Sequence, residues 1–206
     1  MKSNTVDRSY NEHHNFAFHP YNIMLVLVLA AITVLFLGVS IAFVYTRVNA
    51  GLEAIRIPWL FALNTLILMA SSYTMIRAKK AYLNDETKIY QNCLAATIAL
   101  TLFFLVMQVL AWSQLFHRNI FLDTDNSASY LYILSGLHFA HVLAGLPFLL
   151  LFLYRSKKLM VDPVTVLVYF SDAEKRLKLR LLSLYWHFLD ALWIFLVVFL
   201  FFNQLL

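Results

Sequence analysis

Four ionisable residues stand inside otherwise apolar stretches of the sequence. His138 and His141 are three positions apart in one stretch, and His187 and Asp190 are three apart in another. Residues three apart share a face of a helix, so each stretch would present its two polar groups together. Ionisable groups are expensive in hydrocarbon, and where they occur there they mark ion or proton pathways, cofactor sites or polar contacts between helices.

Metal chemistry needs more ligands than the sequence places beside these residues. Zinc or iron takes three or four ligands, and no further histidine or carboxylate adjoins the His138 and His141 pair. A bis-histidine haem would need His138 or His141 opposite His187 on a second helix. We favour a polar cluster between helices that contains all four residues. Two alternatives stay open: a stand-alone membrane metalloprotein or cytochrome with histidine ligands, and a small proton-coupled transporter with Asp190 in its relay.

The elements that hold these residues are predicted to be membrane-spanning helices. The chain has 206 residues, of which 62% are hydrophobic and 13% charged. Soluble domains are closer to 45–50% apolar and about 25% charged. A spanning helix needs about 20 mostly apolar residues. Five segments meet this condition, which predicts an all-α, polytopic bundle of five transmembrane helices at about 21–45, 57–75, 93–116, 130–154 and 182–202.

A polar tail, residues 1–20, precedes the predicted five-helix domain, residues 21–206. Its adjacent His13 and His14 could bind a metal, but such a pair on a tail is more often solvated. Alternation of the five spans places thirteen of the sixteen Lys and Arg residues on the side of the tail. The positive-inside rule then predicts the N-terminus inside and the C-terminus outside. The net charge of +5 thus reflects topology, and we expect no nucleic-acid partner.

Three stretches together resemble subunit III of haem-copper oxidases. Leu184–Trp193 reads LYWHFLDALW, similar to the family's YWHFxDxxW signature. Gly136–Gly145 reads GLHFAHVLAG, similar to GxHGxHVxxG with Phe139 in place of a glycine. Leu63–Ser72 reads LNTLILMASS, similar to NTxxLLxSS. The motifs occur in the family's order, and the chain matches the last five helices of the longest, seven-helix members.

The resemblance implies a non-catalytic subunit of a respiratory oxidase in the bacterial cytoplasmic membrane. Such a subunit binds no haem or copper itself, packs on the catalytic subunit I, which holds those cofactors, and contacts other oxidase subunits. It binds phospholipid and supports proton uptake, proton pumping and sustained oxygen reduction. The residues that match family motif positions, and that we expect to hold the bundle together or shape a lipid or subunit contact, are Asn64, Ser71, His138, His141, His187, Asp190 and Trp193.

Two acidic residues of the family pattern are missing from this sequence. Ile32 stands where a carboxylate usually occurs early in the first matching helix, and Ala111 where a glutamate precedes an aromatic residue. Any proton-buffering or lipid-headgroup role of those acids is therefore not expected here, which favours a structural and lipid-binding role.

Overall fold

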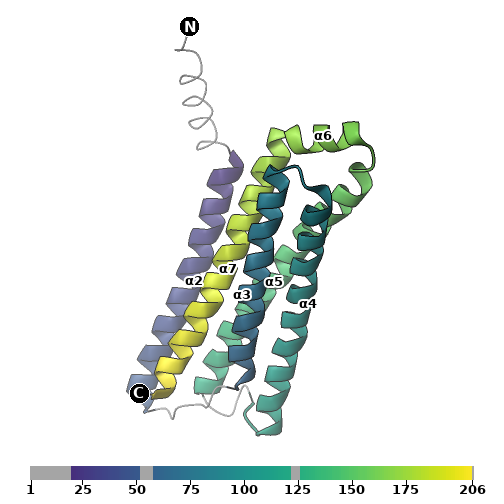
Figure 1. Ribbon diagram of the computed structural model, residues 1–206. Helices are drawn as coiled ribbons and strands as arrows, with labels where there is room; N and C mark the ends of the chain where they lie inside the picture. The colour runs from purple at the N-terminus through teal and green to yellow at the C-terminus, as the bar shows by residue number, and fades with distance from the viewer. Residues whose placement is uncertain (1–19, 52–57, 122–125, 206) are drawn as a thin grey trace. The chain divides into compact units, whose positions relative to one another are not determined.

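Long α-helices form nearly all of the chain that the structure describes. The computed structural model describes residues 20–51, 58–121 and 126–205. Its helices are α2 (Pro20–Ala50), α3 (Leu60–Leu83), α4 (Thr87–His117), α5 (Asn126–Leu159), α6 (Pro163–Ser171) and α7 (Ala173–Leu205), as Figure 1 shows. All of them except α6 are long and apolar enough to cross a bilayer, which confirms the five predicted spans.

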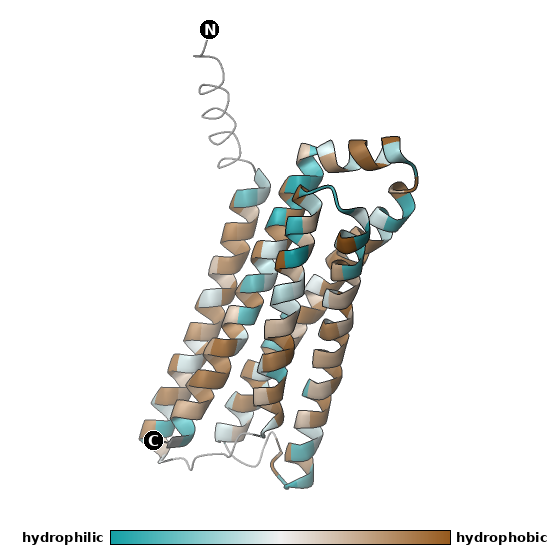
Figure 2. Cartoon of the chain, viewed as in Figure 1, coloured by the Kyte–Doolittle hydropathy of each residue, from teal (hydrophilic) through white to brown (hydrophobic). Residues whose placement is uncertain are grey.

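Every spanning helix is longer than the segment predicted for it. At 1.5 Å per residue, the 31 residues of α4 extend about 46 Å, whereas a bilayer with its headgroups is about 40–45 Å thick. The added turns are polar, because hydropathy identifies only the part of a helix that lies in hydrocarbon. Figure 2 shows this pattern, with hydrophobic residues along the middle of α4 and α7 and hydrophilic residues near their ends.

The chain divides into two compact units, residues 1–38 and 39–206. In the second unit, α3 packs against α4 and α7, and α5 also packs against α4 and α7. These four helices therefore close a ring of contacts, and their facing side chains form the core of the unit. The last part of α2 belongs to the same unit, where the Phe43 ring lies 5.1 Å from the ring of Tyr130 in α5.

A short helix, α6, lies within the segment 155–181, for which no helix was predicted. It runs across the end of the four-helix unit and connects α5 to α7 (Figure 1). Asp162 precedes the helix and Pro163 occupies its first position, where the missing N–H of proline is tolerated. The prediction missed α6 because its nine residues are too few to span a membrane. The division into tail and domain and the inside position of the N-terminus stay predictions.

Candidate functional site

Hydrogen bonds between α3 and α7 connect the residues of two sequence motifs. The indole N–H of Trp186 donates to the Ser71 hydroxyl at 3.1 Å. The indole N–H of Trp193, two turns further along α7, donates to the Thr65 hydroxyl at the same distance. The residue number rises along α7 as it falls along α3, so the two helices are antiparallel. We call the contacts of Thr65, Ser71 and Ser72 with Trp186, His187 and Trp193 the α3–α7 seam.

Ser72 lies between the two ionisable residues of α7. Its hydroxyl is 2.7 Å from Nδ1 of His187, and Ser72 and Asp190 line the same groove between α3 and α7. Asp190 is only 7% exposed, and its Oδ2 atom has no hydrogen-bond partner among the described residues. His187 and Asp190 thus both lie beside a serine of the neighbouring helix.

His138 lies in an aromatic environment and not among polar groups. Its fully buried ring is 4.9 Å from the ring of Trp193 and 5.7 Å from that of Phe104. Neither ring nitrogen has a hydrogen-bond partner among the residues described. Phe61 of α3 stacks on Trp193, with the two ring centres 5.4 Å apart. His138 therefore packs as part of the core at the point where α4, α5 and α7 meet.

His141 makes one hydrogen bond within its own helix and one between α5 and α7. Its Nδ1 atom is 2.6 Å from the carbonyl oxygen of Leu137, and its own carbonyl accepts a 2.9 Å hydrogen bond from the Tyr185 hydroxyl. Close by, Gly145 allows α7 to approach α5. A Cβ atom on Gly145 would lie 2.9 Å from the ring of Tyr185 and 3.0 Å from that of Trp186.

The expectation of one polar cluster containing both histidine pairs is wrong. His187 contacts Ser72 of α3, and Asp190 lies beside the same helix. The His138 ring packs against aromatic rings, and the His141 ring contacts a backbone carbonyl of its own helix. Sequence spacing shows which residues share a face but not which neighbouring helix that face meets. The sequence did not identify Thr65 and Ser72 as partners of the motif residues. The two are seven positions apart, the same spacing as between Trp186 and Trp193.

Asn64 joins α3 to α4 within the core. Its Nδ2 group donates a 2.8 Å hydrogen bond to Oε1 of Gln108, and both side chains are fully buried. A direct amide contact between helices satisfies polar atoms that hydrocarbon could not. Ala111, at the position of a missing family acid, is also fully buried in α4. A carboxylate there would point into the packed interior.

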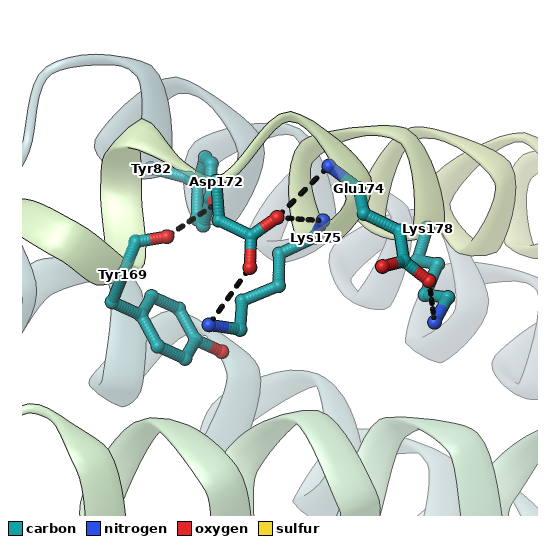
Figure 3. Close-up of polar contacts among 6 residues, drawn as sticks. All are labelled: Tyr82, Tyr169, Asp172, Glu174, Lys175 and Lys178. Atoms are coloured by element: carbon teal, nitrogen blue, oxygen red, sulfur yellow. Dashed lines mark hydrogen bonds and ion pairs between the residues drawn. The ribbon is translucent and has the colours of Figure 1, made fainter.

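Charged groups pair at the turn between α6 and α7, as Figure 3 shows. Asp172 caps α7, because its Oδ1 accepts the backbone N–H groups of Glu174 and Lys175 at 3.0 and 3.3 Å. Its Oδ2 pairs with the Lys175 ammonium at 3.0 Å. The hydrogen bond from Lys175 holds the pKa of the Asp172 carboxyl below its usual value. Lys178 pairs with Glu174 one turn further on.

A cluster of aromatic residues fixes this turn to the ends of α3 and α4. The hydroxyl of Tyr82 donates to the carbonyl oxygen of Tyr169 at 3.0 Å (Figure 3). The Tyr82 ring also lies 5.1 Å from Phe170 and 5.4 Å from Tyr90, in edge-to-face geometry. Burial in this cluster raises the pKa of the Tyr169 phenol. Aromatic packing and the Tyr82 hydrogen bond therefore set the position of α6, which carries no charged residue itself.

No three side chains of His, Cys, Asp or Glu come together in a metal-binding group within residues 20–51, 58–121 and 126–205. His13 and His14 lie outside these described residues. The polar groups of the second unit instead connect helix to helix. Together, the five spanning helices and this internal hydrogen bonding define a multi-pass helical protein of the membrane.

Comparisons with known proteins give the family. The family model "Cytochrome c oxidase subunit III" matches residues 5–204, so the chain belongs to that family. The cytochrome c oxidase subunit 3 of Synechocystis is 32% identical over 91% of this chain and 78% of its own length. The probable cytochrome c oxidase subunit 3 of Rickettsia prowazekii is 33% identical over 68% of this chain and 46% of its own.

A third relative, the cytochrome c oxidase subunit 3 of Bacillus sp. strain PS3, is 29% identical over 69% of this chain and 64% of its length. The chain thus spans about half the length of the Rickettsia relative and larger parts of the other two. Its five spans and these bacterial relatives indicate a multi-pass protein of the bacterial cytoplasmic membrane.

Proposed function

We propose that this chain is a non-catalytic subunit of a respiratory haem-copper oxidase, packed on the catalytic subunit I. The observation that carries the proposal is the family match over residues 5–204. In this role it binds phospholipid and supports proton uptake, proton pumping and sustained oxygen reduction, while haem and copper are held by the partner subunit. Other subunits of the oxidase are further partners.

The contacts of the motif residues support a role in holding structure. Ser71 accepts a hydrogen bond from Trp186 across the α3–α7 seam, and Trp193 donates one to Thr65. Asn64 connects α3 to α4, and the backbone carbonyl of His141 connects α5 to α7. A chain that positions a neighbouring catalytic subunit needs a bundle of fixed shape, and these contacts provide one. Hydrogen bonds between membrane helices each contribute about 0.6 kcal/mol on average, so the shape depends on several of them acting together.

Purification of the tagged chain from its native membrane tests this proposal. We expect a complex that contains a haem-copper catalytic subunit, with the absorption spectrum of its haems. The chain expressed alone should show no Soret band and no stoichiometric metal. A purified complex without a haem-copper subunit would contradict the proposal, and haem or metal bound to the isolated chain would favour the alternative of a membrane metalloprotein.

Loss of the chain tests its supporting role. An oxidase purified from a strain that lacks the chain should begin turnover at a normal rate and then inactivate faster than the complete enzyme, with slower proton uptake. Restoring the chain should restore the lifetime of activity. An unchanged time course would remove the proposed support of turnover. Proton transport by vesicles that contain this chain alone would instead favour the transporter.

A further inference from the structure

A groove between α3 and α7 opens at the surface of the second unit, and the carboxyl-bearing Asp190 is one of its lining residues. The groove encloses about 300 Å³ and is lined by one stripe of α3, from Thr65 to Ile76, and by Asp190 and Ile194 of α7. Met69, Tyr73 and Ile76 form its rim and are 55%, 60% and 42% exposed. It is thus an apolar groove with a polar floor formed by Ser72 and Asp190.

The floor of the groove lies near the middle of the membrane. Asp190 lies between Trp186 and Trp193 of α7, which hydrogen bond to Ser71 and Thr65 of α3. It is therefore level with the middle of the apolar stretch of α3 that precedes Arg77. Phospholipid headgroups lie at the membrane surface, so only hydrocarbon or protein reaches this depth.

Asp190 has an acceptor atom that the second unit does not satisfy. Ser72 is already engaged with His187 Nδ1 at 2.7 Å, and Oδ2 of Asp190 has no partner among the described residues. A buried polar atom without a hydrogen bond is costly, and hydrocarbon offers no donor. An occupant that hydrogen bonds to Oδ2 as an acceptor would bring an N–H or O–H group to this depth.

The spacing of the lining residues favours a helix as that occupant. Thr65, Leu68, Ser72 and Ile76 follow one another at intervals of three or four, with Met69 and Tyr73 beside them. Such spacing forms the seam into which the side chains of a second helix pack. The stripe from Thr65 to Ile76 is about 17 Å long, which is three turns of a packed helix.

We infer that this groove receives a transmembrane helix of another subunit, which donates a hydrogen bond to Asp190 from a neutral polar side chain at mid-membrane depth. The inference rests on the proposed function, because it requires a partner chain. The donor has the chemistry of a hydroxyl, an amide or an indole on an otherwise apolar helix. A cationic donor does not fit, since the rim offers no second acid to compensate its charge.

Photo-crosslinking in the native membrane tests the inference. A benzophenone amino acid replaces Met69 or Ile76 in the groove, and Leu102, which is 48% exposed on α4, serves as the control position. We expect a discrete protein adduct from the two groove positions, with the same partner identified by mass spectrometry. Adducts with lipid only, or only within this chain, would overturn the inference.

Two variants then test whether Asp190 and the groove are what the partner recognises. D190L removes the acceptor, and M69W fills the groove while Asp190 stays in place. With the crosslinker at Ile76, each should lower the yield of the protein adduct about threefold or more, in line with the loss of an interhelical hydrogen bond or of its packing surface. D190N, whose amide oxygen still accepts, should keep most of the yield.

Circular dichroism and gel filtration of D190L and M69W report whether the bundle itself is intact. An unchanged adduct yield in both variants would overturn the assignment of this groove. Failure here is distinguishable from failure of the proposed function. If the chain purifies with a haem-copper oxidase but its groove meets only lipid, the function stands and this inference falls. If no oxidase purifies with the chain, the proposed function itself fails.

Discussion

Polar groups in the α3–α7 seam and at the turn between α6 and α7 are stabilised in different ways. In the seam, Trp186 and Trp193 each donate to one hydroxyl of the facing helix. At the turn, Asp172 accepts two backbone N–H groups and pairs with Lys175, and Glu174 pairs with Lys178. The seam thus uses single bonds between mostly uncharged groups, whereas the turn uses charges.

The difference follows from the surroundings of each region. The pairs at the turn are partly exposed, with 34% of the Asp172 side chain accessible, so water can replace a lost partner. The seam lies within two membrane spans, and in hydrocarbon a donor without its acceptor stays unsatisfied. A lost hydrogen bond or a side chain of the wrong size should therefore destabilise the seam more than the turn. Salt and pH should affect the turn. Four experiments test this contrast, beginning with the largest expected effect.

Close packing behind the seam should tolerate no added atom. G145A places a methyl group 2.9 Å from Tyr185 and 3.0 Å from Trp186, and Trp186 is only 1% exposed. We expect a loss of about 1–3 kcal/mol in the free energy of unfolding, measured in mixed micelles with increasing SDS. G136A is the matched control on the same helix, because its Cβ atom meets nothing within 4 Å. Equal losses in both variants would contradict close packing at Gly145.

Loss of the Asp172 cap at the turn should destabilise only the start of α7, and by less than the G145A substitution. D172A removes the acceptor of the Glu174 and Lys175 N–H groups, which costs about 1 kcal/mol at a typical helix N-terminus. The expected result is faster amide exchange in the first turn of α7, with no change in the middle of the helix. D162A, before α6, is the control. Faster exchange throughout α7 would mean that the turn also supports the seam.

The strength of a single seam bond can be isolated with a double-mutant cycle. W186F and S71A each remove one partner of the 3.1 Å hydrogen bond. We expect a coupling energy of about 0.6 kcal/mol, because the unfolded chain in the membrane also finds hydrogen-bond partners. W193F with T65V provides an independent cycle two turns away. Coupling near zero in both cycles would show that the two tryptophan bonds do not help to hold α7 against α3.

The five spans were predictable because a run of apolar residues is a property of the sequence by itself. The neighbours of His138 were not, since nothing in its spacing to His141 indicates that Phe104 and Trp193 will surround it. Trp186 and Trp193 were visible as motif residues, but their acceptors come from α3, more than a hundred positions away. The short helix α6 was not predicted, because it is held by contacts with distant residues, such as that of Tyr82 with Tyr169.

The turn should respond to acid, with the smallest effect of the four. The pKa of Asp172 is lowered by Lys175, so its charged form is favoured in the folded protein. Its contribution is therefore present above the unfolded pKa of about 3.9 and is lost as the pH falls through the lower, folded value. For a pair this exposed, we expect about 0.3–0.5 kcal/mol.

Amide exchange of Glu174 and Lys175, corrected for the intrinsic effect of pH, should be unchanged between pH 7 and 5 and should accelerate below pH 4. D172N, which cannot titrate, should remove this acceleration. An acceleration that persists in D172N would assign the acid response to another group.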